Sequence, residues 1–196
     1  MTKTTIKSAP QRETEIKCMI EPQTYERIRN LFEWDWEKEQ INSYYSDSAG
    51  LLRKNGITFR VRTKDGKNKI QIKKHTKTNG ALQISEETEF ETDSIPESFC
   101  AAEVEKMTGI ACQARLLGSL LTMRSSKTFG STEICLDKNE YLGVVDFEIE
   151  LEYIGNVEKE LTDILAKEGV LFSEKANGKC SRFMKRLSQI IQSTQQ

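Results

Sequence analysis

The sequence is organised around two segments, Glu13-Thr14-Glu15-Ile16-Lys17 near its start and Asp146-Phe147-Glu148-Ile149-Glu150-Leu151-Glu152 near its end. In both, charged and apolar residues alternate with a period of two, which is the pattern of a β-strand with one charged and one apolar face. The charged faces would carry Glu13, Glu15 and Lys17 in the first strand and Asp146, Glu148, Glu150 and Glu152 in the second. A motif as short as Glu-x-Glu-x-Lys proves little alone, so the interpretation depends on whether other strands repeat this division.

Six further segments are predicted as strands: 41–45, 57–62, 69–73, 82–91, 121–124 and 132–137. Asp65-Gly66 separates two alternating runs and predicts a β-hairpin, and Asn79-Gly80 predicts a second turn. Helical spacing predicts helices over 23–39, over 96–121 with a break near Gly109, over 156–167, and from 175 or 178 to 190. Eight strands and several helices in 196 residues, with no internal repeat, predict a single α+β domain over residues 1–196.

The overall composition excludes several classes of function. The chain carries 29 basic and 30 acidic residues, a net charge of -1, which argues against a general affinity for nucleic acid or anionic lipid. Its first ten residues contain no apolar run, and no stretch of 18 apolar residues follows, so we expect neither a signal peptide nor a membrane span.

Cysteine and histidine usage further narrows the chemistry. The five cysteines are scattered, with no C-x-x-C pair, and are expected to be reduced thiols in a cytoplasmic protein. His75, the single histidine, lies in a turn-like stretch and is expected to be an exposed loop residue, which argues against a Ser-His triad, a Cys-His pair or a His-rich zinc site. A metal would then be held by carboxylate oxygens, which suit Mg²⁺, Mn²⁺ or Ca²⁺.

Two arrangements of the charged faces compete. The first is an ordinary antiparallel sheet whose charged face lies in water. The second is a closed barrel with the charged faces inward and the apolar faces outward, under the helices. The distribution of charge favours the barrel: the strands near Glu13, Glu87, Asp137 and Glu148 are acidic, whereas those near Arg60, Lys73 and Arg124 are basic. A solvated surface usually mixes the two signs.

An inward arrangement constrains the chemistry of the interior. Two carboxylates about 4 Å apart repel by roughly 4 kcal/mol at an effective dielectric constant near 20. The acidic set would therefore need protons or a divalent cation, and the basic set would need an anion with many oxygens. A polyphosphate bridged to a metal ion satisfies both sets.

At this point the chain resembles the CYTH family, the triphosphate tunnel metalloenzymes, most closely its short stand-alone bacterial members. The resemblance rests on Glu13-x-Glu15-x-Lys17, Arg60-x-Arg62, Lys73, Glu87-x-Glu89, Arg124, Asp137 and Glu148-x-Glu150, in this order and strand phase. It implies a closed eight-stranded antiparallel β-barrel, a tunnel with a charged interior and helices outside. It also implies a bound triphosphate with Mg²⁺ or Mn²⁺ as cofactor.

The resemblance assigns roles to these residues. It places Glu13, Glu15, Glu148 and Glu150 at the metal with Asp137 nearby, and it gives phosphate binding to Lys17, Arg60, Arg62, Lys73 and Arg124. Lys17, Glu87 and Glu89 would be catalytic, the two glutamates by helping a second metal or the attacking water. Lys179, or Lys175 in its place, would close the site. Thr122 and Ser85 depart from the pattern, because many relatives carry Lys and Arg there.

The predicted activity is metal-dependent hydrolysis of inorganic triphosphate or a related organic triphosphate. Two alternatives stay open: an adenylyl cyclase that makes cyclic AMP from ATP, and a non-catalytic polyphosphate- or nucleotide-binding module. The expected partner is a small-molecule triphosphate, with neither nucleic acid nor membrane, and the sequence allows a homodimer.

Overall fold

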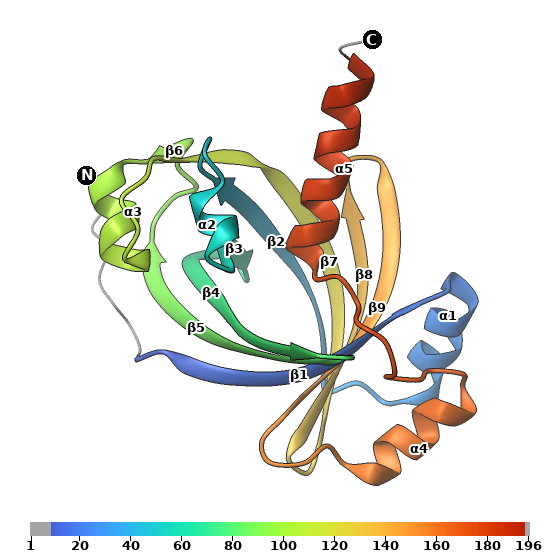
Figure 1. Cartoon of the computed structure of the whole chain (residues 1–196). Coiled ribbons are helices and arrows are strands. Elements are labelled where there is room, and N and C mark those ends of the chain that lie inside the picture. Colours follow the sequence, from blue (N-terminus) through green and yellow to red (C-terminus); the bar gives the residue numbers. More distant parts are fainter. Residues whose placement is uncertain (1–8, 195–196) are drawn as a thin grey trace. The chain divides into compact units, whose positions relative to one another are not determined.

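The computed structural model describes residues 9–194, which form nine strands and five helices (Figure 1). The strands are β1 (Gln11–Ile20), β2 (Trp36–Ser46), β3 (Ile57–Lys64), β4 (Lys67–Asn79), β5 (Leu82–Thr92), β6 (Ser98–Phe99), β7 (Ala114–Phe129), β8 (Thr132–Tyr141) and β9 (Val144–Tyr153). The helices are α1 (Pro22–Leu31), α2 (Leu51–Lys54), α3 (Ala101–Thr108), α4 (Lys159–Lys167) and α5 (Lys179–Thr194). None of the helices in this range combines the length and the apolar character needed to cross a membrane.

The strands form one sheet in the order β2-β3-β4-β5-β1-β9-β8-β7-β6, and β2 also pairs with β7. This additional pairing closes eight strands into a barrel and leaves the two-residue β6 as an appendage. The pairs β1–β9, β2–β3, β3–β4, β7–β8 and β8–β9 are all antiparallel. The closed eight-stranded antiparallel barrel predicted from the sequence is therefore confirmed.

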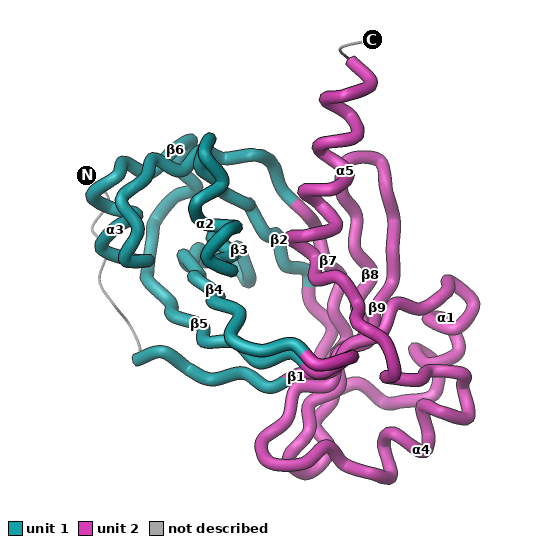
Figure 2. Tube along the Cα trace, viewed as in Figure 1, with its two compact units in different colours: residues 1–14, 39–78, 83–119 teal, residues 15–38, 79–82, 120–196 magenta. Residues whose placement is uncertain are grey.

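The described residues divide into two compact units, shown in different colours in Figure 2. The first comprises residues 9–14, 39–78 and 83–119, and the second comprises 15–38, 79–82 and 120–194. Each unit has its own hydrophobic cluster. Whether the chain unfolds as the single domain expected from the sequence stays a prediction.

In the first unit, the apolar faces of the strands pack under α2 and α3. Phe59 and Val61 of β3 and Ile70 of β4 join Leu52 of α2 and Val104 of α3 in one buried cluster. The opposite faces of β3, β4 and β5 carry polar side chains that are also buried, among them Arg60, Gln71 and Glu87.

The second unit repeats this division with different helices. Ile134 of β8 and Ile149 of β9 pack against Ile28 of α1 and Leu161 and Leu165 of α4. The opposite faces bury Glu15, Lys17, Asp137, Glu148 and Glu150. Both units therefore confirm that helices cover the apolar faces and that the charged faces are enclosed.

Several predicted boundaries are wrong. The helix predicted over 23–39 begins at Pro22 but ends at Leu31. The next residue, Phe32, has an extended backbone, and its ring packs edge-to-face against Trp34 and Phe129. The second half of the helix predicted over 96–121 is strand β7. Helix α3 ends at Thr108 and is followed by Gly109, whose φ of 76° makes it a left-handed C-cap. The cap predicted at Asn156 lies instead at Glu158, and α2 was not predicted.

The hairpin at Asp65-Gly66 is confirmed, because Lys64 pairs with Lys67 and both turn residues have positive φ values of 53° and 71°. His75 is exposed as expected, but it lies within β4 rather than in a loop. The strand continues through it to Asn79.

Candidate metal and phosphate site

The register of β1, β8 and β9 brings together acidic side chains that are distant in sequence. Asp137 of β8 lies opposite Glu148 of β9, and Glu15 of β1 lies opposite Glu152 of β9. Carboxylate oxygens of Asp137, Glu148 and Glu150 all lie within 4.8 Å of one another, and Glu15, Glu150 and Glu152 form a second such group. Four of these five side chains belong to the set predicted to lie at or near the metal.

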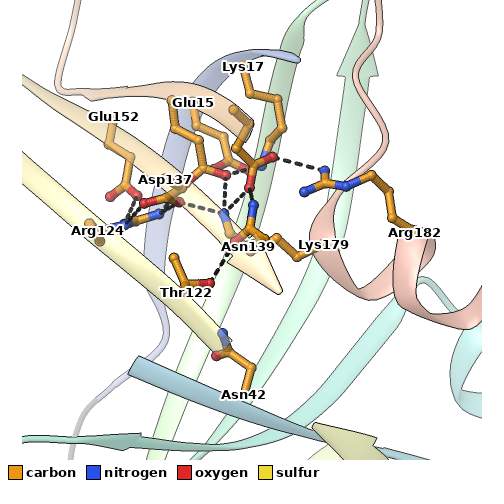
Figure 3. Close-up of polar contacts among 12 residues, drawn as sticks. Glu15, Lys17, Asn42, Thr122, Arg124, Asp137, Asn139, Glu152, Lys179 and Arg182 are labelled. Atoms are coloured by element: carbon orange, nitrogen blue, oxygen red, sulfur yellow. Dashed lines mark hydrogen bonds and ion pairs between the residues drawn. The ribbon is translucent and has the colours of Figure 1, made fainter. Parts of the chain in front are cut away.

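Two cations from neighbouring strands contact these carboxylates (Figure 3). The Nζ of Lys17 lies 2.7 Å from an oxygen of Glu150 and 3.2 Å from one of Glu15. Arg124 donates two hydrogen bonds to Asp137, at 2.8 Å from Nε and 2.7 Å from a terminal nitrogen, and also bonds Glu150. This fork grips a carboxylate in the way that it would grip a phosphate.

The first residue of α5 adds a third cation. Lys179 Nζ lies 2.8 Å from Asp137 and 3.1 Å from Glu150, and it also forms an ion pair with Glu148. Lys179 is buried, whereas Lys175, the alternative proposed from the sequence, is exposed. The ammonium therefore contacts the same three carboxylates that are grouped closely enough to hold a metal ion.

Arg182, one turn further along α5, was not assigned a role from the sequence. Its guanidinium donates to Asp146 at 2.8 Å and to Glu148 at 2.9 Å. The available signal was its spacing of three from Lys179, which places both side chains on the same side of a helix. Where the helix docks is a tertiary feature that this spacing does not specify.

Opposite charges hold the central carboxylates ionised. Burial raises the pKa of Glu148, but Lys179 and Arg182 outweigh it and bring that pKa to about 2. Burial likewise raises the pKa of Glu150, whereas Lys17 and Lys179 draw it well below its usual value. Both side chains are therefore anionic near neutral pH and offer charged oxygens to a ligand.

We refer to these ion-paired side chains of the second unit as the carboxylate network. Its members are Glu15, Asp137, Asp146, Glu148, Glu150 and Glu152 together with Lys17, Arg124, Lys179 and Arg182. Six acidic and four basic groups leave two negative charges, the charge that one divalent cation neutralises. Clustered carboxylate oxygens are the ligand type that Mg²⁺ and Mn²⁺ prefer, so the residues fit such an ion.

Other residues predicted at the site lie in the first unit. Glu13 forms an ion pair with Lys73 at 2.7 Å. The Nε of Arg60 donates to Gln71 at 2.9 Å, and the Nε of Arg62 donates to Asn42 at 3.0 Å. Arg60 and Arg62 lie on one face of β3, as the sequence predicted.

The two glutamates proposed to be catalytic differ in their partners. Glu87 accepts from Arg60 at 3.3 Å, and Glu89 accepts from Lys69 at 2.6 Å and from Gln71 at 2.7 Å. Burial raises the pKa of Glu89, but Lys69 and Gln71 more than compensate and lower it. A lowered pKa makes Glu89 a poorer proton acceptor and a better charge partner for a cation.

Neutral side chains occupy the two positions at which the resemblance to the family led us to note a departure. Thr122 is fully buried and donates to Asn139 at 2.7 Å. Ser85 is also fully buried, and its hydroxyl has no hydrogen-bond partner among residues 9–194. Both departures noted in the sequence therefore lie in the enclosed polar faces.

Known proteins share these features at the levels of sequence and fold. The family model of the CYTH domain matches residues 11–179. A protein of Bacillus subtilis (strain 168) named "Putative triphosphatase YjbK" is 30% identical over 147 residues, which cover 71% of this chain and 76% of that protein.

Two solved structures share the fold at lower identity. A putative adenylate cyclase from Bacillus halodurans is 21% identical, with a TM-score of 0.68 over 90% of this chain and 99% of its own. The Hippeastrum protein HpAC1, described as a putative adenylyl cyclase with a dominant triphosphatase activity, is 20% identical, with a TM-score of 0.70 over 88% of this chain and 95% of its own. With the matched residues running from the acidic first strand to Lys179, this chain belongs to the CYTH domain family.

Proposed function

We propose that this protein is a divalent-metal-dependent phosphohydrolase that removes the terminal phosphoryl group of inorganic triphosphate or a related organic triphosphate. The observation that carries the proposal is the meeting of Asp137, Glu148 and Glu150 with Lys179, within a network that retains two negative charges. The family membership and the name of the Bacillus subtilis relative support the same reaction class.

The carboxylates would hold Mg²⁺ or Mn²⁺. Such an ion polarises phosphoryl oxygens and lowers the pKa of a bound water. Lys17, Arg124 and Lys179 would exchange part of their carboxylate contacts for phosphate oxygens and neutralise charge on the transferring group and on the leaving pyrophosphate. No protein nucleophile is required.

The cations of the first unit are proposed to bind phosphate. Arg60, Arg62 and Lys73 retain the role suggested by the family pattern, and Glu13 is proposed to contribute to metal binding. Glu87 or Glu89 would help a second metal or the attacking water. Glu87 and Glu89 both form ion pairs with cations. Because such pairing keeps a carboxylate charged, it favours help to a second metal over proton transfer from the attacking water.

A phosphate-release panel tests the function directly. Inorganic triphosphate, thiamine triphosphate and ATP are each incubated with Mg²⁺ or Mn²⁺, and the ATP reactions are also analysed for cyclic AMP. Metal-dependent phosphate release without cyclic AMP is expected. Cyclic AMP as the main product would indicate the cyclase, and tight binding of triphosphate without turnover would indicate a non-catalytic module.

Glu148→Gln is expected to reduce metal-dependent phosphate release by about 100-fold or more, because a neutral amide replaces a central anionic ligand. Circular dichroism checks that the variant remains folded. The matched control is Glu160→Gln, which makes the same change at an exposed position of α4. Full activity of Glu148→Gln would contradict the metal assignment.

Arg60→Ala is expected to raise KM for triphosphate by about tenfold and also to lower kcat, because a charged hydrogen-bond donor is lost. Initial rates over a range of substrate concentrations separate the two effects. A rate curve that matches the wild type would exclude Arg60 from substrate binding.

A cytoplasmic location and the capacity to form a homodimer are also proposed. The five cysteines, all within residues 9–194, form no disulfide in this structure, and reduced cysteines are typical of a reducing compartment. Fractionation of the native host tests the location, and light scattering on the purified chain tests the oligomeric state.

A further inference from the structure

Two buried amide side chains on β2 lack partners for their donor groups. Gln40 is 3% exposed and Asn42 is 0% exposed. Among residues 9–194, neither the Nε2 of Gln40 nor the Nδ2 of Asn42 finds a hydrogen-bond acceptor. Leaving such donors unsatisfied costs free energy, so a buried amide of this kind indicates a missing acceptor.

The orientation of Asn42 is determined by its neighbour on β3. Arg62 lies directly opposite Asn42, and its Nε donates to Oδ1 of Asn42 at 3.0 Å. A flipped amide would turn its NH₂ group toward the guanidinium, which can only donate. The Nδ2 of Asn42 is therefore left to donate to something else.

The same face gathers further donors. Gln40 and Asn42 are two residues apart on one strand, so their side chains lie on the same face, and their partners across the pairing are Lys64 and Arg62. Two neutral NH₂ groups thus stand beside two cationic side chains. A ligand that satisfies this face must present several acceptor atoms and negative charge.

We propose that Gln40 and Asn42 donate side-chain hydrogen bonds to phosphoryl oxygens of the bound triphosphate, as substrate-positioning residues on β2. The inference rests on the proposed function and adds two neutral donors to its cationic phosphate-binding residues. Neutral donors supply direction without adding charge, so they would orient phosphoryl oxygens beside the cations that bind them.

If the NH₂ group serves the substrate, removing it should weaken substrate binding without lowering the stability of the fold. Gln40→Met keeps the length of the side chain and removes the unpartnered NH₂ group. The variant is expected to unfold at the same temperature as the wild type or higher, yet to raise KM for inorganic triphosphate about 5- to 10-fold. Asn42→Asp replaces the donor by an acceptor that can still pair with Arg62, and should raise KM at least tenfold.

The control is Gln113→Glu, which adds the same single negative charge as Asn42→Asp at an exposed position of the same unit. It should leave KM and the unfolding temperature unchanged. Binding is measured independently of turnover as the rise in unfolding temperature caused by inorganic triphosphate, which should shrink in both β2 variants and persist in the control.

The outcomes separate this inference from the proposed function. If the wild type hydrolyses triphosphate and both β2 variants keep its KM and its thermal shift, the inference alone is overturned. An effect on thiamine triphosphate and ATP without one on inorganic triphosphate would assign the donors to the organic group and also overturn it. A loss of stability in Gln40→Met with unchanged KM would indicate a structural water as the acceptor. A wild type that neither binds nor hydrolyses triphosphate would overturn both proposals.

Discussion

Lys179 lies where a divalent cation would compete with it. Its ammonium contacts Asp137, Glu148 and Glu150, and these are the three carboxylates grouped closely enough to hold a metal ion. The contacts raise the pKa of Lys179 despite its burial, which by itself would lower that pKa. The side chain is therefore charged and stabilises carboxylates that would otherwise repel one another.

Lys179→Met should consequently destabilise the chelated protein and strengthen its response to metal. Breaking a buried ion pair from one side is strongly destabilising, and we expect the unfolding temperature in EDTA to fall by about 6–20 °C. Added Mn²⁺ should then raise the unfolding temperature of the variant by more than it raises that of the wild type, because the ion no longer competes with an ammonium group. Differential scanning fluorimetry measures both effects.

The exposed Lys175 supplies the control for this experiment. Lys175→Met removes the same charge close by in sequence and should behave as the wild type. Equal metal-induced shifts in Lys179→Met and the wild type would mean that the metal binds elsewhere.

The residues of the network show what the sequence could and could not predict. Glu15, Glu148 and Glu150 were predictable because period-two alternation fixes the face of a strand side chain wherever the strand lies. Arg182 and the amide of Asn42 were missed. The prediction used alternating charges along strands, and neither a residue on a helix nor a single neutral residue on a strand belongs to such a pattern. Arg182 reaches Glu148 only because α5 docks against β9. Asn42 reaches Arg62 only because of the register between β2 and β3.

At the level of whole elements, the largest error in the predicted secondary structure, the helix expected over 96–121, occurred where apolar residues cluster. The run Leu116-Leu117 and Leu120-Leu121 fits helical spacing as well as a strand, and periodicity alone cannot separate the two. Pairing decides the outcome: Ala114 pairs with Phe99 of β6, and residues from Leu121 onward pair with β8. The Asp65-Gly66 hairpin was predictable because its turn chemistry is local.

Helix α2 depends on a side-chain cap that contributes a pH dependence. The carboxylate of Asp47 accepts the backbone N–H groups of Leu51 at 2.8 Å and Leu52 at 2.9 Å. Burial raises the pKa of Asp47, but these hydrogen bonds from Leu52 and Leu51 bring it below its ordinary value of 3.8. A depressed carboxylate pKa stabilises the fold above the unfolded-state pKa, and that stability is lost as the pH falls through the folded-state value.

Asp47→Asn should therefore cost about 0.5–2 kcal/mol of unfolding free energy at pH 7. The difference from the wild type should be unchanged at pH 5 and should shrink below about pH 4, where the wild-type carboxyl begins to protonate. Urea unfolding at pH 7, 5 and 3.5 measures it. Asp93→Asn, at an exposed position, is the control; a difference for Asp47→Asn that does not vary with pH would contradict the role of charge in this cap.

For the whole molecule, the decisive feature is that five strands contain residues of both compact units. The boundaries between units fall at 14/15 within β1, at 38/39 within β2, at 78/79 within β4, at 82/83 within β5 and at 119/120 within β7. Loss of either unit would leave part of each of these five strands unsupported. This continuity predicts that the chain unfolds in one cooperative transition, as the expectation of a single domain requires.

A matched pair of substitutions tests this cooperativity. Ile70 and Ile149 are both fully buried, one in the hydrophobic cluster of each unit. Ile→Val at either position should cost about 0.5–1.5 kcal/mol and lower a single midpoint by about 1–6 °C. Calorimetry should give equal calorimetric and van't Hoff enthalpies, near 140 kcal/mol at about 0.7 kcal/mol per residue. If each substitution instead moved only one of two separate transitions, the units would be independent folding domains, because a shared cooperative strand cannot lose stability on one side alone.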